Sequence, residues 1–176
     1  ALAEAAAERG AKVQLILGPS ALDTKHPGVN LQRVESAREM YQLATDHFTN
    51  SDIAIMAAAV ADYRPAEVAE EKIKKDGDTL SINMVRNPDI AASLGKEKRA
   101  DQILVGFALE TTNEEANAKG KLERKNLDLI VLNSLRDPGA GFNVDTNRIS
   151  ILSRNNKARQ FELKSKKAVA EDILDE

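Results

Sequence analysis

Short apolar runs alternate with helical segments along most of this chain. The strand-like runs are rich in Ile, Leu and Val and cover residues 13–18, 51–59, 102–108 and 127–133. Helix candidates lie between and before them, at 1–9, 36–48, 88–95 and 113–126. Continuous apolar runs are typical of strands that are covered on both faces. The alternation therefore predicts an α/β fold, with a mainly parallel sheet between two layers of helices.

The sequence changes character after residue 134. Two strand-like segments, RISIL at 148–152 and RQFEL at 159–163, flank an Asn-Asn-Lys turn, and residues 164–176 have a helical pattern. This predicts an antiparallel hairpin and a closing helix. The expected fold class is therefore a three-layer, Rossmann-like α/β fold with an added antiparallel hairpin, and such a hairpin covers a sheet edge or makes a dimer contact.

Composition excludes several classes of protein. Of the 176 residues, 42% are hydrophobic and 30% are charged, which is typical of one soluble globular domain. Cysteine is absent, so we expect no disulfide and no thiolate metal site, and only two histidines leave little scope for a His-based metal centre. No apolar run is long enough for a membrane span, and no signal peptide is recognisable, so we expect a cytoplasmic protein. The net charge of −3 gives no general attraction to nucleic acid.

The chain opens inside a helical pattern, ALAEAAAERG, without an initiator Met. A helix that enters a strand such as VQLIL is normally the second half of a strand, loop and helix unit. We therefore expect residues 1–176 to form a single domain whose amino-terminal strand and phosphate-binding loop are missing.

Small residues and a carboxylate follow the strand predicted at 51–59. Residues 57–61 have no bulky side chain at the carboxyl end of what we expect to be a central strand, where a ligand can approach the backbone. Close packing of a helix on the sheet would explain them equally well. Asp62 could accept hydrogen bonds from a ligand or support a metal ion held by phosphates, although a turn-capping Asp is also common.

Two further segments carry charges. Lys72, Lys74 and Lys75 belong to a charged segment that reads as a solvated arm or as a flap that closes over a phosphate. In the segment 86–91, RNPDIA, Asn87 could cap a helix that starts with Pro88. Free N–H groups at that helix start could bind an anion, although Asp89 in the first turn would repel it.

Phe107 lies near the end of a buried strand and could stack on a base, although core packing is the commoner use of Phe. Lys121 and Lys125 are four residues apart and share one face of the helix predicted at 113–126. The other neighbours of Lys121 on that face are not acidic. An external anion would explain this cluster, and so would attraction to the negative end of the helix dipole.

Five segments, AAAVADYRP, KIKK, NPDI, GFALET and KLERKNLDLIVLN, occur in an order and at spacings that resemble the bacterial phosphopantothenate-cysteine ligase domain of the bifunctional coenzyme A biosynthesis protein. The resemblance extends through nearly the whole chain, including GFNVDTN. It implies a ligase in which CTP activates the carboxylate of 4'-phosphopantothenate as an acyl-cytidylate with release of pyrophosphate. The amine of cysteine then attacks the acyl group and releases CMP.

The resemblance also implies roles for particular residues. Asp62 and Lys72 would contact CTP, and Lys72 would act catalytically from a flap. The remaining nucleotide-binding positions would be the backbone at Met56, Ala57 and Ala58, the turn Pro88, Asp89, Ile90 and Ala91, the ring of Phe107, and Lys121 and Lys125, which would hold the triphosphate. Mg2+ is expected with the triphosphate, and no metal ligands are assigned.

The same resemblance implies partners and limits. The family works as a homodimer, for which the hairpin near 142–163 is the candidate contact. Bifunctional members carry a flavin-dependent decarboxylase domain, so FMN is expected only in that domain, which is absent from this chain. Two other hypotheses stay open: a Rossmann-like NAD(P)-dependent oxidoreductase, for which Asp23 is a poor ribose-binding residue, and a nucleotide-binding module without catalysis.

Overall fold

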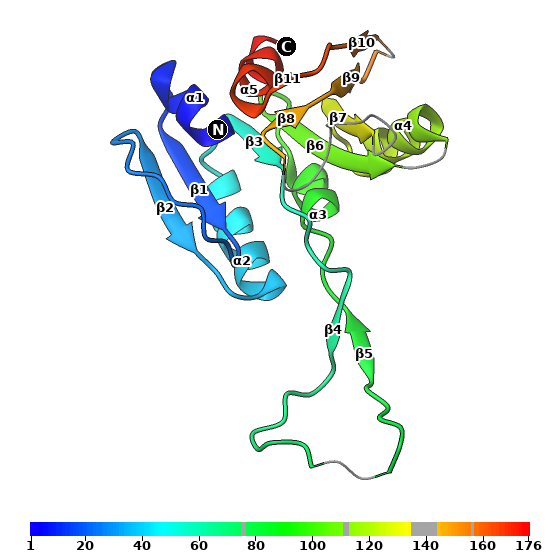
Figure 1. Ribbon diagram of the computed structural model, residues 1–176. Coiled ribbons are helices and arrows are strands. Elements are labelled where there is room, and N and C mark those ends of the chain that lie inside the picture. Colours follow the sequence, from blue (N-terminus) through cyan, green and yellow to red (C-terminus); the bar gives the residue numbers. More distant parts are fainter. Residues whose placement is uncertain (75–76, 111–112, 135–143, 156) are drawn as a thin grey trace.

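The computed structural model describes residues 1–74, 77–110, 113–134, 144–155 and 157–176. Its largest sheet has five strands in the order β10-β9-β7-β6-β3 (Figure 1). The strands β3 (Ile53–Met56), β6 (Ile103–Glu110) and β7 (Leu129–Ser134) are parallel to each other. Antiparallel to β7 runs β9 (Ile149–Ser153), which pairs with β10 (Ala158–Gln160). The expected mainly parallel sheet with an antiparallel hairpin is confirmed.

Helices cover both faces of this sheet. Alternate residues of β6 and β7 point to opposite faces, so that Leu104 and Val105 belong to different core clusters. One cluster packs under α2 (Ala37–Phe48), α3 (Ile90–Glu97) and α4 (Glu114–Arg124). The other lies under α5 (Lys166–Asp175), with α1 (Leu2–Glu8) beside it. The molecule therefore has the three predicted layers.

Two strands near the amino terminus form a separate parallel pair. In this pair β1 (Val13–Leu17) lies next to β2 (Val29–Arg33), with Val13 opposite Val29. The strand β2 was not predicted, because its short, half-polar sequence lacks a continuous apolar run. The pair packs on α1 and α2, and these helices contact α5 and α3. Helices on both faces therefore connect the small sheet to the large one.

A long arm leaves the sheet between β3 and α3 (Figure 1). Its base is an antiparallel pair of β4 (Tyr63–Pro65) and β5 (Met84–Arg86). The described residues between these two strands form neither helix nor strand, and many are exposed.

The strand predicted at 51–59 is shorter in the structure, because β3 ends at Met56. We also expected this strand to be central, and it is the edge strand of the five-stranded sheet.

The carboxyl-terminal segment differs slightly from its prediction. The helix α5 begins at Lys166, and the Ser165 hydroxyl caps it by accepting a hydrogen bond from the Ala168 N–H. The preceding β11 (Lys164–Ser165) pairs with β8 (Thr146–Asn147) in an antiparallel bridge.

No helix within the described part of the chain is long and apolar enough to cross a membrane.

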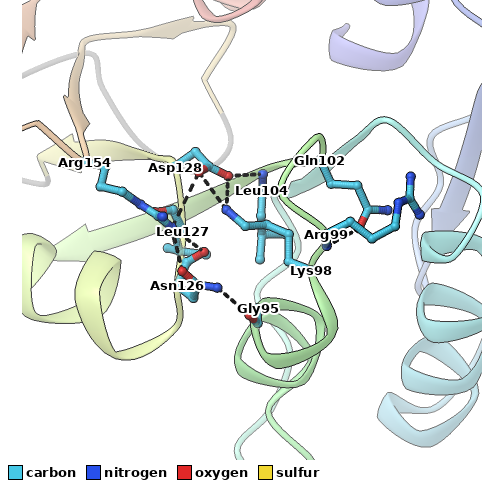
Figure 2. Close-up of polar contacts among 9 residues, drawn as sticks. All are labelled: Gly95, Lys98, Arg99, Gln102, Leu104, Asn126, Leu127, Asp128 and Arg154. Carbon is cyan, nitrogen blue, oxygen red and sulfur yellow. Dashed lines mark hydrogen bonds and ion pairs between the residues drawn. The ribbon is translucent and has the colours of Figure 1, made fainter.

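A polar network fixes the start of β6 and β7 relative to α3 and α4 (Figure 2). The Asp128 carboxylate accepts hydrogen bonds from Lys98 Nζ, at 2.5 and 2.6 Å, and from the Leu104 N–H at 2.8 Å. The Lys98 side chain is only 6% exposed, and this ion pair compensates its buried charge. Nearby, Asn126 donates its side-chain amide to the Gly95 carbonyl at 2.6 Å. These contacts hold the last turn of α3 against the end of α4.

Candidate functional site

A cavity of about 320 Å³ opens beyond the carboxyl end of β3. It lies between the start of α3, the last turn of α4 and the base of the arm, which is the edge where α/β sheets usually bind ligands. This volume is at the lower end of the range for small-molecule sites. Its lining residues are Met56, Ala58, Val60, Ala61, Asp62, Arg86, Asn87, Pro88, Asp89, Ile90, Ala91, Gly106, Phe107, Lys121, Lys125, Leu127 and Ile130.

Small side chains form the wall that follows β3. Ala58, Val60 and Ala61 line the cavity in a segment without regular structure. Asp62 follows them at the point where the chain enters the arm, and it is exposed. The absence of bulk leaves room for a ligand next to the backbone, as predicted for residues 57–61, although Ala57 itself does not line the cavity.

Asn87 ties together the two sides of the arm's base. Its side chain is 7% exposed and donates to the Ala61 carbonyl at 2.8 Å, while its Oδ1 accepts from Arg64 Nη1 at 3.1 Å. Its backbone N–H donates to the Asp62 carbonyl at 2.8 Å. The prediction that Asn87 caps the following helix is therefore wrong. Its polar groups instead form hydrogen bonds with the other side of the arm's base, and these bonds fix the backbone of Asp62.

Asp89 is the residue that caps α3. Its carboxylate accepts from the Ala92 N–H at 3.0 Å and pairs with Lys125 Nζ at 2.9 Å. Burial raises the pKa of the Asp89 carboxyl, but the hydrogen bonds from Lys125 and Ala92 and the charges of Lys125 and Arg86 outweigh burial and lower this pKa below its usual value. Asp89 is therefore ionised at neutral pH and neutralises a cation of the cavity.

This pair corrects one sequence-based expectation. The i±3 and i±4 neighbours of Lys121 along the helix are not acidic, but α3 supplies a carboxylate to Lys125 across the cavity. Lys121 lines the same cavity one helical turn earlier. The cluster is therefore partly compensated by a contact between two helices, which no spacing within one helix could reveal.

The cavity brings together ten of the twelve predicted site residues, and the exceptions are Ala57 and Lys72. Lys72 is exposed on the arm, and Lys75 of the same segment lies outside the described residues. Phe107 lines the cavity and also packs against the core cluster under α5, so its ring contributes to the core, and stacking on a base stays a prediction.

Three lining residues, Gly106, Leu127 and Ile130, lie outside every segment that the sequence singled out for a ligand. Four others were not named as site residues, although Val60 and Ala61 belong to the predicted segment 57–61 and Arg86 and Asn87 to the segment 86–91. Leu127 and Ile130 carried only the signal of a buried strand, which does not distinguish a cavity wall from a core. Arg86 was within the segment singled out as a helix start, and its basic charge was the signal that could have marked it.

The described residues contain no group of three or more His, Cys, Asp or Glu side chains placed to hold a metal ion. Asp62 and Asp89 are the carboxylates of the cavity, and Asp89 already pairs with Lys125.

Known proteins resemble this chain over its full length. The model of the DNA/pantothenate metabolism flavoprotein C-terminal domain matches residues 1–176. A "Cysteine/Cysteine sulfinic acid decarboxylase" from an unknown prokaryotic organism is 52% identical, over 99% of this chain and 48% of that protein. The "Coenzyme A biosynthesis bifunctional protein CoaBC" of Haemophilus influenzae is 47% identical, over 100% of this chain and 43% of that protein.

A crystal structure of the C-terminal domain of a CoaBC protein superposes with a TM-score of 0.82 at 37% identity, over 99% of this chain and 76% of that chain. The present chain spans about half the length of the curated relatives that it matches. Because the family model covers every residue, the chain belongs to the family of DNA/pantothenate metabolism flavoprotein C-terminal domains.

Proposed function

We propose that this chain is the ligase domain that joins 4'-phosphopantothenate to cysteine in coenzyme A biosynthesis, with CTP as the activating nucleotide. The observation that carries the proposal is the cavity, which gathers ten residues expected to bind the nucleotide from four separate segments of the chain. The similarity to the CoaBC protein of Haemophilus influenzae and to the CoaBC C-terminal domain supports the substrate class.

The proposed reaction has two steps. A carboxylate oxygen of 4'-phosphopantothenate attacks the α-phosphorus of CTP, and pyrophosphate leaves. The cysteine amine then attacks the acyl carbon, a C–N bond forms, and CMP leaves with the carboxylate oxygen, giving phosphopantothenoylcysteine. The carboxylate is activated because CMP is a far better leaving group than an oxide. Positioning and neutralisation of phosphate charge are the main tasks left for the protein.

The residues of the cavity suit these tasks. Lys121 and Lys125 supply positive charge for the phosphates, and the small residues after β3 admit the nucleotide close to the backbone. Asp62 offers acceptor oxygens for hydroxyl or amino groups. Mg2+, when bound, would neutralise phosphate charge, and Asp62 is the carboxylate of the described cavity wall without an ion pair to hold it.

Lys72 lies on the exposed arm and not in the cavity, so its proposed role depends on movement of the arm. As a compact charge on a flexible side chain, it can reach a phosphate when the arm closes over the nucleotide. We expect Lys72→Gln to slow pyrophosphate release. Lys74→Gln is the matched control, because Lys74 is an exposed lysine of the same arm and we assign it no role.

Decarboxylation and nucleotide binding without catalysis are two alternatives to ligation. The relative named as a decarboxylase matches over 48% of its length, so its decarboxylase activity can belong to the part outside the match. FMN and a fused decarboxylase domain are proposed only for a longer polypeptide. A nucleotide-binding module without catalysis would keep the cavity and fail to release pyrophosphate.

Homodimer formation is also part of the proposal, with the hairpin near 142–163 as the contact. Residues 142, 143 and 156 of this hairpin lie outside the described part of the chain. Several of its apolar side chains, including Ile151 and Phe161, are buried against the sheet and α5, whereas Val144 and Leu163 are exposed. A partner would therefore meet the exposed outer strand β10, whose residues Ala158, Arg159 and Gln160 leave one strand edge unpaired.

We also propose that the domain is completed by a parallel strand and a loop that precede α1. The support is in the sheet: β1 and β3 each have one unpaired edge, and β1 lies between β2 and β3 (Figure 1). Neither β1 nor β3 contains a buried residue, although Leu104 of β6 and Val131 of β7 are fully buried. A right-handed crossover through α1 places the preceding strand beside β1, in the space next to β3.

Such a strand would make β3 central and would put its following loop next to the cavity. Hydrogen exchange tests the idea in a natural polypeptide that includes residues before α1. We expect slow exchange of backbone amides in β1 and β3, because both edges are then paired. Exchange as fast as in the open edge strand β10 would contradict the proposed insertion.

The decisive experiment for the ligase proposal uses the natural polypeptide that contains residues 1–176. It is mixed with Mg2+, 4'-phosphopantothenate and either CTP or ATP, and pyrophosphate is measured before and after cysteine is added. We expect release with CTP before cysteine, and CMP and phosphopantothenoylcysteine after it. Nucleotide binding without pyrophosphate release would favour the binding module, and equal turnover with ATP would refute the role of CTP.

A further inference from the structure

Arg86 is a third cation of the cavity. It is the last residue of β5 and lines the same space as Lys121 and Lys125, which come from α4. Its charge acts on the Asp89 carboxyl, where it helps to lower the pKa together with Lys125. Positive charge therefore reaches the cavity from the base of the arm as well as from the helix.

The backbone of Arg86 is held in a fixed position. Its carbonyl accepts a hydrogen bond from Arg64 Nη1 at 2.9 Å. The next residue, Asn87, is buried and is anchored to the other side of the arm through the Ala61 and Asp62 carbonyls. The direction from which the Arg86 side chain enters the cavity is thus set by the packing of the arm's base.

The guanidinium of Arg86 has no acidic partner among the described residues. Its one described contact is the ring of Tyr63, with the guanidinium carbon 5.8 Å from the ring centre. Tyr63 lies directly opposite Arg86 in the β4–β5 pair, so the two side chains share one face. Asp89, the acid of the cavity on which the Arg86 charge acts, is already bound by Lys125 and by the Ala92 N–H.

A planar guanidinium that is oriented by a ring and keeps its N–H donors free suits an anion with two acceptor oxygens. A lysine provides a point charge without this directionality. We propose that Arg86 is a phosphate-binding residue of the cavity, which contacts the phosphate chain of the nucleotide from the side opposite α4. The inference rests on the proposed function for the identity of the nucleotide, but the anion site itself does not.

Titration calorimetry with the natural polypeptide that contains residues 1–176 tests this inference. The probes are CTP with Mg2+, inorganic tripolyphosphate and cytidine. We expect Arg86→Gln to weaken the binding of CTP and of tripolyphosphate about tenfold or more, as for loss of a charge-assisted hydrogen bond. Cytidine affinity is expected to stay within about twofold, because the base and ribose do not depend on this charge.

Two further variants separate recognition from structure. Arg86→Lys keeps the charge and loses the planar fork, so its affinity for tripolyphosphate should lie between those of the wild type and Arg86→Gln. Arg38→Gln removes the same charge from an exposed position on α2, outside the cavity, and should bind all three probes as the wild type does. Thermal unfolding checks that each variant is folded.

The outcomes distinguish the two proposals. Unchanged tripolyphosphate affinity in Arg86→Gln, or an equal loss for cytidine, would overturn the role of Arg86 in phosphate binding. Wild-type protein that binds tripolyphosphate through Arg86 but shows no preference for CTP would leave the anion site standing and refute the proposed nucleotide. Wild-type protein that binds neither CTP nor tripolyphosphate would overturn both.

Discussion

Replacing Gly95 by alanine tests whether close packing of α3 on the end of α4 gives the cavity its shape. Gly95 is buried in α3, and a Cβ atom there would meet the Lys125 carbonyl oxygen at 1.9 Å and its carbonyl carbon at 2.8 Å. Both atoms belong to the backbone and cannot rotate away. The hydrogen bond from Asn126 to the Gly95 carbonyl joins the same two segments, so either α3 or the end of α4 must shift.

The expected change in the free energy of unfolding follows from two opposing effects. Alanine in a helix interior is more favourable than glycine by about 1 kcal/mol. Overpacking of a dense interior costs about 1–3 kcal/mol, and a clash with backbone belongs at the upper end. We therefore expect Gly95→Ala to lower the free energy of unfolding by about 2 kcal/mol. Because Lys125 would move relative to Asp89, nucleotide affinity should fall as well.

Gly120 is the matched control, since it lies in the interior of α4. A Cβ atom at Gly120 would meet only the end of the Arg124 side chain, at 3.0 Å, which can swing aside. Gly120→Ala should therefore raise the free energy of unfolding by about 0.5–1 kcal/mol. Urea unfolding of both variants in the natural polypeptide measures the contrast. A Gly95→Ala variant as stable as Gly120→Ala would refute the packing argument.

Two further predictions concern ionised groups. Asp89→Asn keeps a helix-capping side chain and removes the charge. Since the folded-state pKa of Asp89 is lowered, its contribution is full at neutral pH and is lost as the pH falls below about 4. Urea unfolding across pH should show the difference from wild type shrinking in acid, and a constant difference would argue against the charge. Asp128→Asn should cost about 3 kcal/mol, because it leaves the buried Lys98 ammonium without its ionised partner. A loss below about 1 kcal/mol in the same assay would show that this pair contributes little.

Much of the fold could be predicted because the buried positions of a helix or strand recur at a regular spacing along the sequence. The capping box at Ser36 and Glu39 and the apolar stripe of Met40, Ala44 and Phe48 predict α2 at nearly its observed bounds. The end of β3 could not be predicted, because alanines after Met56 are equally compatible with a strand and with a loop. The strand β2 was missed because it is short and half-buried, and its mixture of polar and apolar residues is also typical of a turn.

The site could be predicted less completely, because its contacts join distant segments. Asn87 and Asp89 are both good helix-capping residues, and sequence alone does not rank them. Asp89 caps α3 because Asn87 is buried against Ala61 at the base of the arm. Likewise, the acidic partner of Lys125 becomes visible only when α3 and α4 are packed together.

The ion pair of Asp89 and Lys125 also explains how a cavity with several cations can form before its ligand binds. Arg86, Lys121 and Lys125 would repel each other in an empty cavity, and such repulsion lowers the stability of the fold. A carboxylate held by the N-terminal cap of α3 offsets part of this cost and fixes one lysine in place. A phosphate chain that enters would meet a partly neutralised and ordered site, and it would gain most from Arg86, which forms no ion pair with Asp89. The strength of phosphate binding should therefore depend on Arg86 more than on Lys125, which has to share its charge with Asp89.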